Sequence, residues 1–97
     1  MKLNTVIKEK TGTIFVEGSI DTLTARDLEQ AVNDAAAQCD KMVLDMSKVD
    51  YISSGGLRVI VGANRTVGQD NFTLRGLAPN VEEIFRLTGF TKYFTIE

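Results

Sequence analysis

The stretch from Val43 to Val61 constrains the fold more than any other part of the chain. The apolar run at 42–44 is typical of an inner strand that is covered on both faces. A helical pattern of apolar residues begins at Leu57. Between them, Asp45 ends the strand pattern and a connection leads to Ser53-Ser54-Gly55-Gly56. The stretch therefore predicts a buried strand, a short exposed connection and the start of a helix.

The rest of the chain alternates strand and helix patterns around this stretch. Strands are expected at 3–10, 14–17, 42–44 and 72–75, with a short final strand at 94–96. Thr11-Gly12-Thr13 is the expected turn of an antiparallel hairpin. Amphipathic helices are expected after Thr24, from Leu57 to Gly68, and from Leu77 to Gly89.

Thr24 with Asp27 three residues later resembles an N-terminal cap for the first helix. The strand–helix–strand order implies parallel pairing with right-handed crossovers. The fold class is therefore α/β, with a mixed sheet of about four to five strands and three or four helices. A chain of 97 residues suits one domain over residues 1–97.

The composition argues against most catalytic and metal chemistry. The chain has no histidine, which is the commonest general base and metal ligand. Its single cysteine, Cys39, can form neither an internal disulfide nor a clustered zinc site. No P-loop motif is present. We therefore expect no metal, no cofactor and no enzymatic activity.

Charge and hydropathy limit the location and the partners. The net charge is −2 and the basic residues are scattered, so nucleic-acid binding has little support. The apolar runs are only a few residues long, which predicts no membrane insertion. Residues 1–4 lead into a strand pattern and do not resemble a signal peptide. The single free cysteine fits a reducing cytoplasm, and a monomer is expected at this size.

Ser53 and Ser54 allow two interpretations. Serine is a favoured N-cap residue, so the pair can simply cap the helix that follows. One serine is enough for a cap, however, and two stand together here before Gly55 and Gly56. Glycine is costly in a first helical turn, but it leaves the backbone bare so that another protein can approach closely. The free N–H groups of a helix start also tolerate a phosphate, either bound or covalently attached.

The segment from Asp45 to Leu57 resembles the signature of the STAS domain, which is the fold of anti-sigma factor antagonists. Gly18-Ser19-Ile20-Asp21 resembles that family's first conserved loop, which lies near its phosphorylation site. Gly89-Phe90 resembles the family's ending. The resemblance covers nearly the whole chain and implies a STAS-like fold.

The resemblance implies a bacterial partner switch with no catalytic activity of its own. A serine kinase of the anti-sigma type would phosphorylate Ser54, with Ser53 as the second candidate. The unphosphorylated chain would bind that anti-sigma factor and free its client, usually a sigma factor. A metal-dependent serine phosphatase would reset the switch. The residues expected to bind the partner are Ser19, Ile20, Asp21, Thr22, Ser53, Gly55, Gly56 and Arg58.

Two other functions stay open at this stage. The chain could be a STAS subunit of a lipid-transport ATPase or of a signalling assembly, with no phosphorylation switch. It could also be a small nucleotide-binding or hydrolytic protein that uses the Ser-Gly-Gly turn. Copurification of a membrane ATPase would favour the first of these, and binding of a labelled nucleotide would favour the second.

Overall fold

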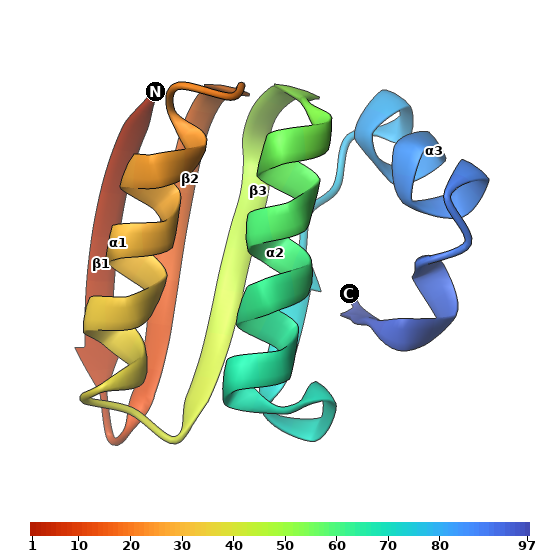
Figure 1. Cartoon of the computed structure of the whole chain (residues 1–97). Coiled ribbons are helices and arrows are strands. Elements are labelled where there is room, and N and C mark those ends of the chain that lie inside the picture. The colour runs from red at the N-terminus through yellow and green to blue at the C-terminus, as the bar shows by residue number, and fades with distance from the viewer.

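Five strands form one mixed sheet in the computed structural model, which describes residues 1–97 (Figure 1). The strands are β1 (Lys2–Lys8), β2 (Thr11–Ile20), β3 (Lys41–Ile52), β4 (Phe72–Arg75) and β5 (Thr95–Ile96). The helices are α1 (Ala25–Ala36), α2 (Ser54–Val67) and α3 (Pro79–Leu87), with short 3-10 turns η1 (Gln69–Asn71) and η2 (Thr91–Tyr93). β1 is antiparallel to β2, and every other neighbouring pair is parallel. The predicted fold class is therefore confirmed.

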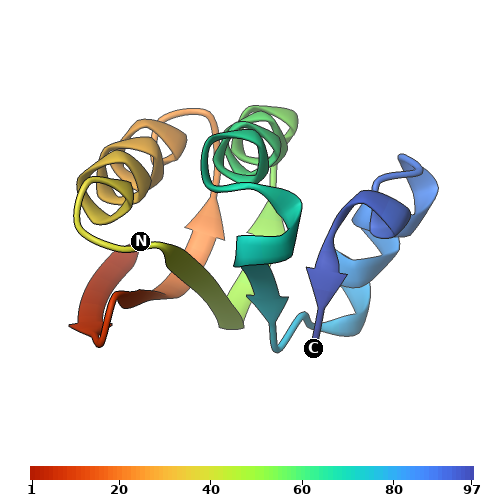
Figure 2. The ribbon, with the colours of Figure 1, turned by 90° about the horizontal axis from the view of Figure 1, so that it is seen from below.

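Only one face of the sheet is covered by α1 and α2, which lie side by side on it (Figure 2). α3 and the C-terminal segment lie beyond α2, next to the β4–β5 edge. On the opposite face Phe15 is 41% exposed, because its neighbours there are mostly polar side chains. The sheet therefore has one face that the helices cover and one face that is open.

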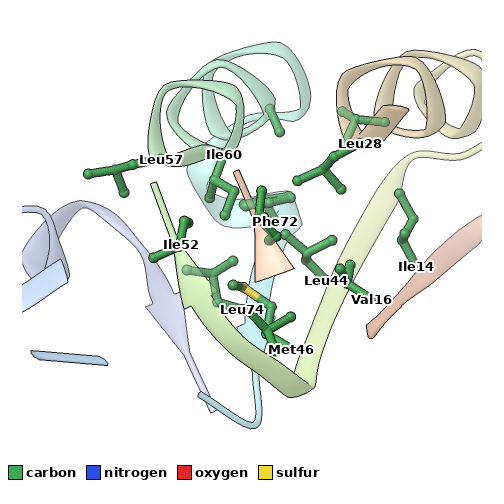
Figure 3. Packing of buried hydrophobic residues seen from close by; sticks show 14 of the residues in the cluster. Ile14, Val16, Leu28, Leu44, Met46, Ile52, Leu57, Ile60, Phe72 and Leu74 are labelled. Atoms are coloured by element: carbon green, nitrogen blue, oxygen red, sulfur yellow. The ribbon is translucent and has the colours of Figure 1, made fainter. Parts of the chain in front are cut away.

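Most of the core lies between the sheet and the helices α1 and α2 (Figure 3), and Val81 and Phe85 of α3 belong to the same buried cluster. Alternate residues of a strand point to the same face, so Leu44 and Met46 of β3 both point toward the helices and are fully buried. Leu28 of α1 and Ile60 of α2 belong to the same buried cluster, and both are also 0% exposed. Burial of each such side chain stabilises the fold by about 1.5–3 kcal/mol.

β3 is longer than the sequence pattern predicted. It continues to Ile52, so the expected exposed connection after Asp45 is wrong. Met46, Val49 and Ile52 are buried, and the segment keeps pairing with β2 through two shifts in register. The shifts in register explain the irregular spacing of these buried residues, because a bulge interrupts the two-residue period of a strand. The strand therefore delivers the chain directly to the start of α2.

The hairpin between β1 and β2 turns at Glu9-Lys10, and the expected turn at 11–13 is wrong because those residues already belong to β2. Glu9 and Lys10 have φ angles of 52° and 66°, which is the left-handed region. A two-residue hairpin loop favours this backbone because it matches the twist of the strands. The sequence carries no glycine or asparagine there, so no turn signal was visible.

Replacing Glu9-Lys10 with Asn-Gly should stabilise the protein by about 1 kcal/mol, because these residues adopt positive φ at less cost. Urea unfolding with an unchanged m-value would measure this gain. An unchanged or lower stability would show that the strain at this turn is negligible.

Asp45 and Arg75 join β3 and β4 on the open face. Arg75 contacts Asp45 Oδ2 through Nε at 3.0 Å and Nη2 at 2.9 Å. The hydroxyl and the amide of Ser47 donate to Asp45 Oδ1 at 2.7 and 3.0 Å. Partial burial by itself would raise the pKa of Asp45, but the bonds from Ser47 and the ion pair with Arg75 outweigh it, so the pKa lies below its usual value.

Asp45→Asn should therefore destabilise the fold by about 1–2 kcal/mol at pH 7. Because the folded-state pKa is lowered, the contribution is complete above the unfolded value of about 4 and is lost as the pH falls through the folded value. Unfolding midpoints measured for both proteins between pH 7 and pH 2 should converge at the acid end. A difference that is independent of pH would contradict the role of the charge.

Candidate functional site

The candidate site lies where β2 and β3 end, at the top edge of the sheet in Figure 1. The loop that enters α1 and the first turn of α2 meet there, since both follow the carboxyl ends of parallel strands. Ligand sites of α/β folds commonly form at such ends. The amide of Ser53 donates to the Ile20 carbonyl at 2.8 Å and so ties the two connections together.

Ser53 is the N-cap of α2. Its backbone is extended, with φ −86° and ψ 171°, and its Oγ accepts a hydrogen bond from the Gly56 amide at 3.1 Å. Its carbonyl accepts the first helical bond, from the Leu57 amide at 2.9 Å. This arrangement is that of a serine cap, so the capping interpretation of the serine pair applies to Ser53.

Ser54 is the first residue of α2 and is exposed. Its hydroxyl makes no hydrogen bond within the chain, in contrast to the hydroxyl of Ser53. It stands at a helix N-terminus, where free amides and the helix dipole favour negative charge. Of the two serines, Ser54 is the one whose oxygen is free to react with a phosphate donor.

The two glycines that follow have different environments. Gly56 is buried, and a Cβ there would lie 2.5 Å from Ile20 Cγ2 and 3.1 Å from Ile52 Cγ1. Glycine at 56 is therefore explained by close packing against β2 and not by access for a partner. At Gly55 a Cβ would stay 3.6 Å from Thr22 Cα, which is an ordinary contact. Only Gly55 keeps the open backbone that the sequence suggested for both.

Ile20 also differs from its expected role as a partner-binding residue. Its side chain is 0% exposed and packs in the core beneath the site. A residue with no exposed surface cannot contact another protein without a rearrangement of the core. Thr22 and Arg58, by contrast, are exposed, and Ser19 and Asp21 are partly exposed.

Asp21 organises the loop that enters α1. Its Oδ1 accepts hydrogen bonds from the amides of Leu23 and Thr24 at 2.9 and 2.8 Å. In return Thr24 Oγ1 accepts from the Asp21 amide at 2.9 Å. The amide of Thr24 and, at 3.1 Å, its hydroxyl donate to Asp21 Oδ1 and lower the pKa of Asp21, and the Leu23 amide adds to this effect. Thr24 is the N-cap residue of α1, as expected, but its side chain makes no cap hydrogen bond, because its hydroxyl is engaged with Asp21.

Asp50 fixes two other segments around the site. The Ser19 hydroxyl donates to Asp50 Oδ1 at 2.8 Å. Asn80, in the first turn of α3, donates through Nδ2 to the Asp50 carbonyl at 2.8 Å. The end of β2, the end of β3 and the start of α3 are thereby held together at this edge of the sheet.

Two exposed apolar side chains near the site escaped the sequence analysis. Leu23 is 82% exposed in the loop after Asp21, and Tyr51 is 51% exposed near the end of β3. Single exposed apolar residues are common. Leu23 lies in the loop that enters α1, and Tyr51 is the residue before Ile52, the last residue of β3. A leucine between threonines in a polar loop was the available signal for the first of them.

The structure holds no group of three or more histidine, cysteine, aspartate or glutamate side chains placed to bind a metal ion. None of its helices combines the length and the apolar character that crossing a membrane requires. The site presents the hydroxyl of Ser54, the amides of the first turn of α2 and the exposed residues around them.

Comparison with known proteins identifies the family. The STAS domain family model matches residues 2–97, so the chain belongs to the STAS domain family. Bordetella bronchiseptica has a relative, BtrV, whose name assigns it as an anti-sigma factor antagonist. It is 36% identical over 87 residues, which cover 84% of this chain and 72% of BtrV. The anti-sigma-B factor antagonist of Listeria monocytogenes is 33% identical over 88 residues, which cover 87% of this chain and 76% of that protein.

Solved structures agree with this assignment. The crystal structure of an anti-sigma factor antagonist from Mycobacterium paratuberculosis superposes with a TM-score of 0.88 and 27% identity. The match covers 98% of this chain and 83% of the other. The unphosphorylated form of the antagonist SpoIIAA superposes with a TM-score of 0.81 at 14% identity, which shows the shared fold.

Proposed function

We propose that this chain is an anti-sigma factor antagonist that works as a phosphorylation-switched binding module and not as an enzyme. The proposal rests on the different hydrogen bonding of the two serine hydroxyls. Ser53 caps α2 with its hydroxyl, whereas Ser54 presents a free hydroxyl on the surface. Two relatives that are 36% and 33% identical to this chain over the aligned 87 and 88 residues are named as antagonists of this class.

In the proposed cycle the unphosphorylated chain binds an anti-sigma factor that is also a serine kinase, and this binding frees the client of that factor. The kinase transfers the γ-phosphoryl group of ATP to Ser54 Oγ, which loses its proton, and ADP leaves. A serine phosphatase hydrolyses the phosphoserine and restores the binding form. The chain supplies only the acceptor hydroxyl.

The physical effect of the phosphate is on the surface and not on the fold. It adds about −1.5 to −2 charges and three acceptor oxygens. At the N-terminus of α2 this charge is compatible with the helix dipole. In a close contact it replaces a small hydroxyl with a bulky anion, so repulsion and desolvation weaken the complex.

The proposed contact surface surrounds Ser54. It includes the exposed and partly exposed residues that the sequence predicted, together with the two exposed apolar side chains. Ile20 and Gly56 are buried and pack beneath this surface. The surface is formed by Ser19, Asp21, Thr22, Leu23, Tyr51, Ser53, Gly55 and Arg58.

Phosphopeptide mapping tests this proposal. The purified chain, Ser54→Ala and Ser53→Ala are each incubated with ATP and lysate of the source organism, and the modified residue is identified by mass spectrometry. We expect phosphate on Ser54 in the unaltered chain and in Ser53→Ala, and none in Ser54→Ala. Phosphate on Ser53 would move the switch to the capping residue. No phosphate, when another antagonist is modified in the same lysate, would favour a constitutive STAS subunit.

A further inference from the structure

A groove runs along α2 and includes the exposed positions Ser54, Arg58, Gly62 and Arg65. Its floor and rim are formed by Ser54, Arg58, Val61, Gly62 and Arg65 of α2. Glu29 of α1 lies on one side and Phe90, which follows α3, lies on the other. We call this hollow the α2 groove. In Figure 2 α2 lies between α1 and the C-terminal segment, which supply these two sides.

The charges of the α2 groove are unpaired. Arg58 and Arg65 are seven residues apart and therefore lie on the same side of the helix. Neither guanidinium forms an ion pair in the chain, whose two ion pairs lie elsewhere. The acidic side chain on the rim is Glu29. A chain with net charge −2 thus carries a local excess of positive charge beside Ser54.

Gly62 lies between the two arginines and is exposed. A Cβ at this position would meet no atom within 4 Å, so the fold does not require a glycine here. Glycine inside a helix costs about 1 kcal/mol relative to alanine. What the missing side chain provides is a low point in the groove, where the backbone of another molecule can approach closely.

The groove continues toward η2 and becomes more apolar. Val61, Arg65 and Phe90 also line the next hollow, together with Tyr93 and Asn64. Asn64 donates to the Tyr93 carbonyl at 3.0 Å, but its buried Oδ1 accepts no hydrogen bond. A buried acceptor without a partner is uncommon in a folded protein.

We propose that the α2 groove binds an acidic amphipathic helix of the anti-sigma factor, an inference that rests on the proposed function. The apolar face of that helix packs on Val61 and Phe90, and its carboxylates pair with Arg58 and Arg65. Ser54 lies at one end of the same groove. Its phosphate would stand one helical turn from Arg58 and compete with those carboxylates for the guanidinium.

Two variants and one control test the α2 groove without disturbing the core. Arg65→Gln removes one charge at a distance from Ser54, and Gly62→Gln fills the low point in open space. Lys41→Gln makes the same charge change at the start of β3 and serves as the control. The probe is the purified kinase that phosphorylates Ser54 in the mapping experiment, and calorimetry gives its Kd for each unphosphorylated chain. Unfolding midpoints establish that each variant is folded.

We expect Arg65→Gln and Gly62→Gln each to weaken binding by about tenfold or more and Lys41→Gln to leave the Kd within about twofold. Unchanged affinities for Arg65→Gln and Gly62→Gln, with the unaltered chain bound, would overturn the groove but leave the proposed function standing. Failure of the kinase to bind even the unaltered chain would overturn both.

Discussion

Ser54→Asp is expected to weaken binding of the anti-sigma factor by about a hundredfold or more while the domain stays folded. The substitution puts a carboxylate where the hydroxyl makes no hydrogen bond within the chain, so nothing in the fold is lost. A negative charge in the first turn of a helix stabilises it by about 0.3–1 kcal/mol. The prediction is thus a loss of affinity together with an equal or slightly higher stability.

Ser53→Asp is the matched control for this charge. Aspartate caps a helix as well as serine does, and at 53 its oxygen can accept the Gly56 amide that the serine hydroxyl now accepts. Ser53 belongs to the proposed contact surface, but there the Gly56 amide holds the charge, so we expect Ser53→Asp to weaken binding less than Ser54→Asp does. Calorimetric titration and thermal unfolding of both variants measure the two effects. Equal losses of affinity would show that the contact does not distinguish Ser54 from the cap.

Gly56→Ala is expected to destabilise the protein by about 2 kcal/mol. The new methyl group would lie 2.5 Å from Ile20 Cγ2, and it would also press on the Ile20 carbonyl at 3.1 Å. Ile20 is fully buried and branched at Cβ, so it cannot turn away from the contact. The better helix propensity of alanine, about 1 kcal/mol, offsets only part of this cost.

Gly55→Ala separates the effect of steric crowding from the effect of helix propensity on stability. Its Cβ would meet only Thr22 and Ser53 at 3.6–3.7 Å, so we expect stability to be unchanged or to rise by up to about 1 kcal/mol. Urea unfolding of the two alanine variants gives the comparison. If Gly56→Ala were as stable as Gly55→Ala, the close approach of α2 to β2 would not be rigid, and the explanation of the glycine pair would be wrong.

Much of the fold could be predicted because its local signals agree with each other. The apolar period of α1, the glycine at 68 that ends α2 with a positive φ, and the apolar run in β3 each indicate the observed element. The turn at Glu9-Lys10 could not be predicted, because glutamate and lysine rarely adopt the left-handed backbone conformation that they have here. The length of β3 was missed because its shifts in register hide the two-residue period.

The candidate site was predictable in its position but not in its details. The serine–glycine motif after a buried strand located the start of α2, yet it could not say which serine caps the helix. That assignment depends on one hydrogen bond, from Gly56 to Ser53. Burial likewise separates Ile20 from the exposed Thr22 beside it, and no pattern of residue types in this short loop encodes that difference.

The most direct test of the switch is the affinity of one purified anti-sigma factor for the two forms of this chain. The chain is phosphorylated at Ser54 by that kinase, and the site and its full occupancy are established by mass spectrometry. Calorimetry then gives the Kd of each form at the same salt concentration. We expect the unphosphorylated form to bind more tightly than the phosphorylated form, by a factor of about one hundred or more. Equal affinities would contradict a partner switch at Ser54.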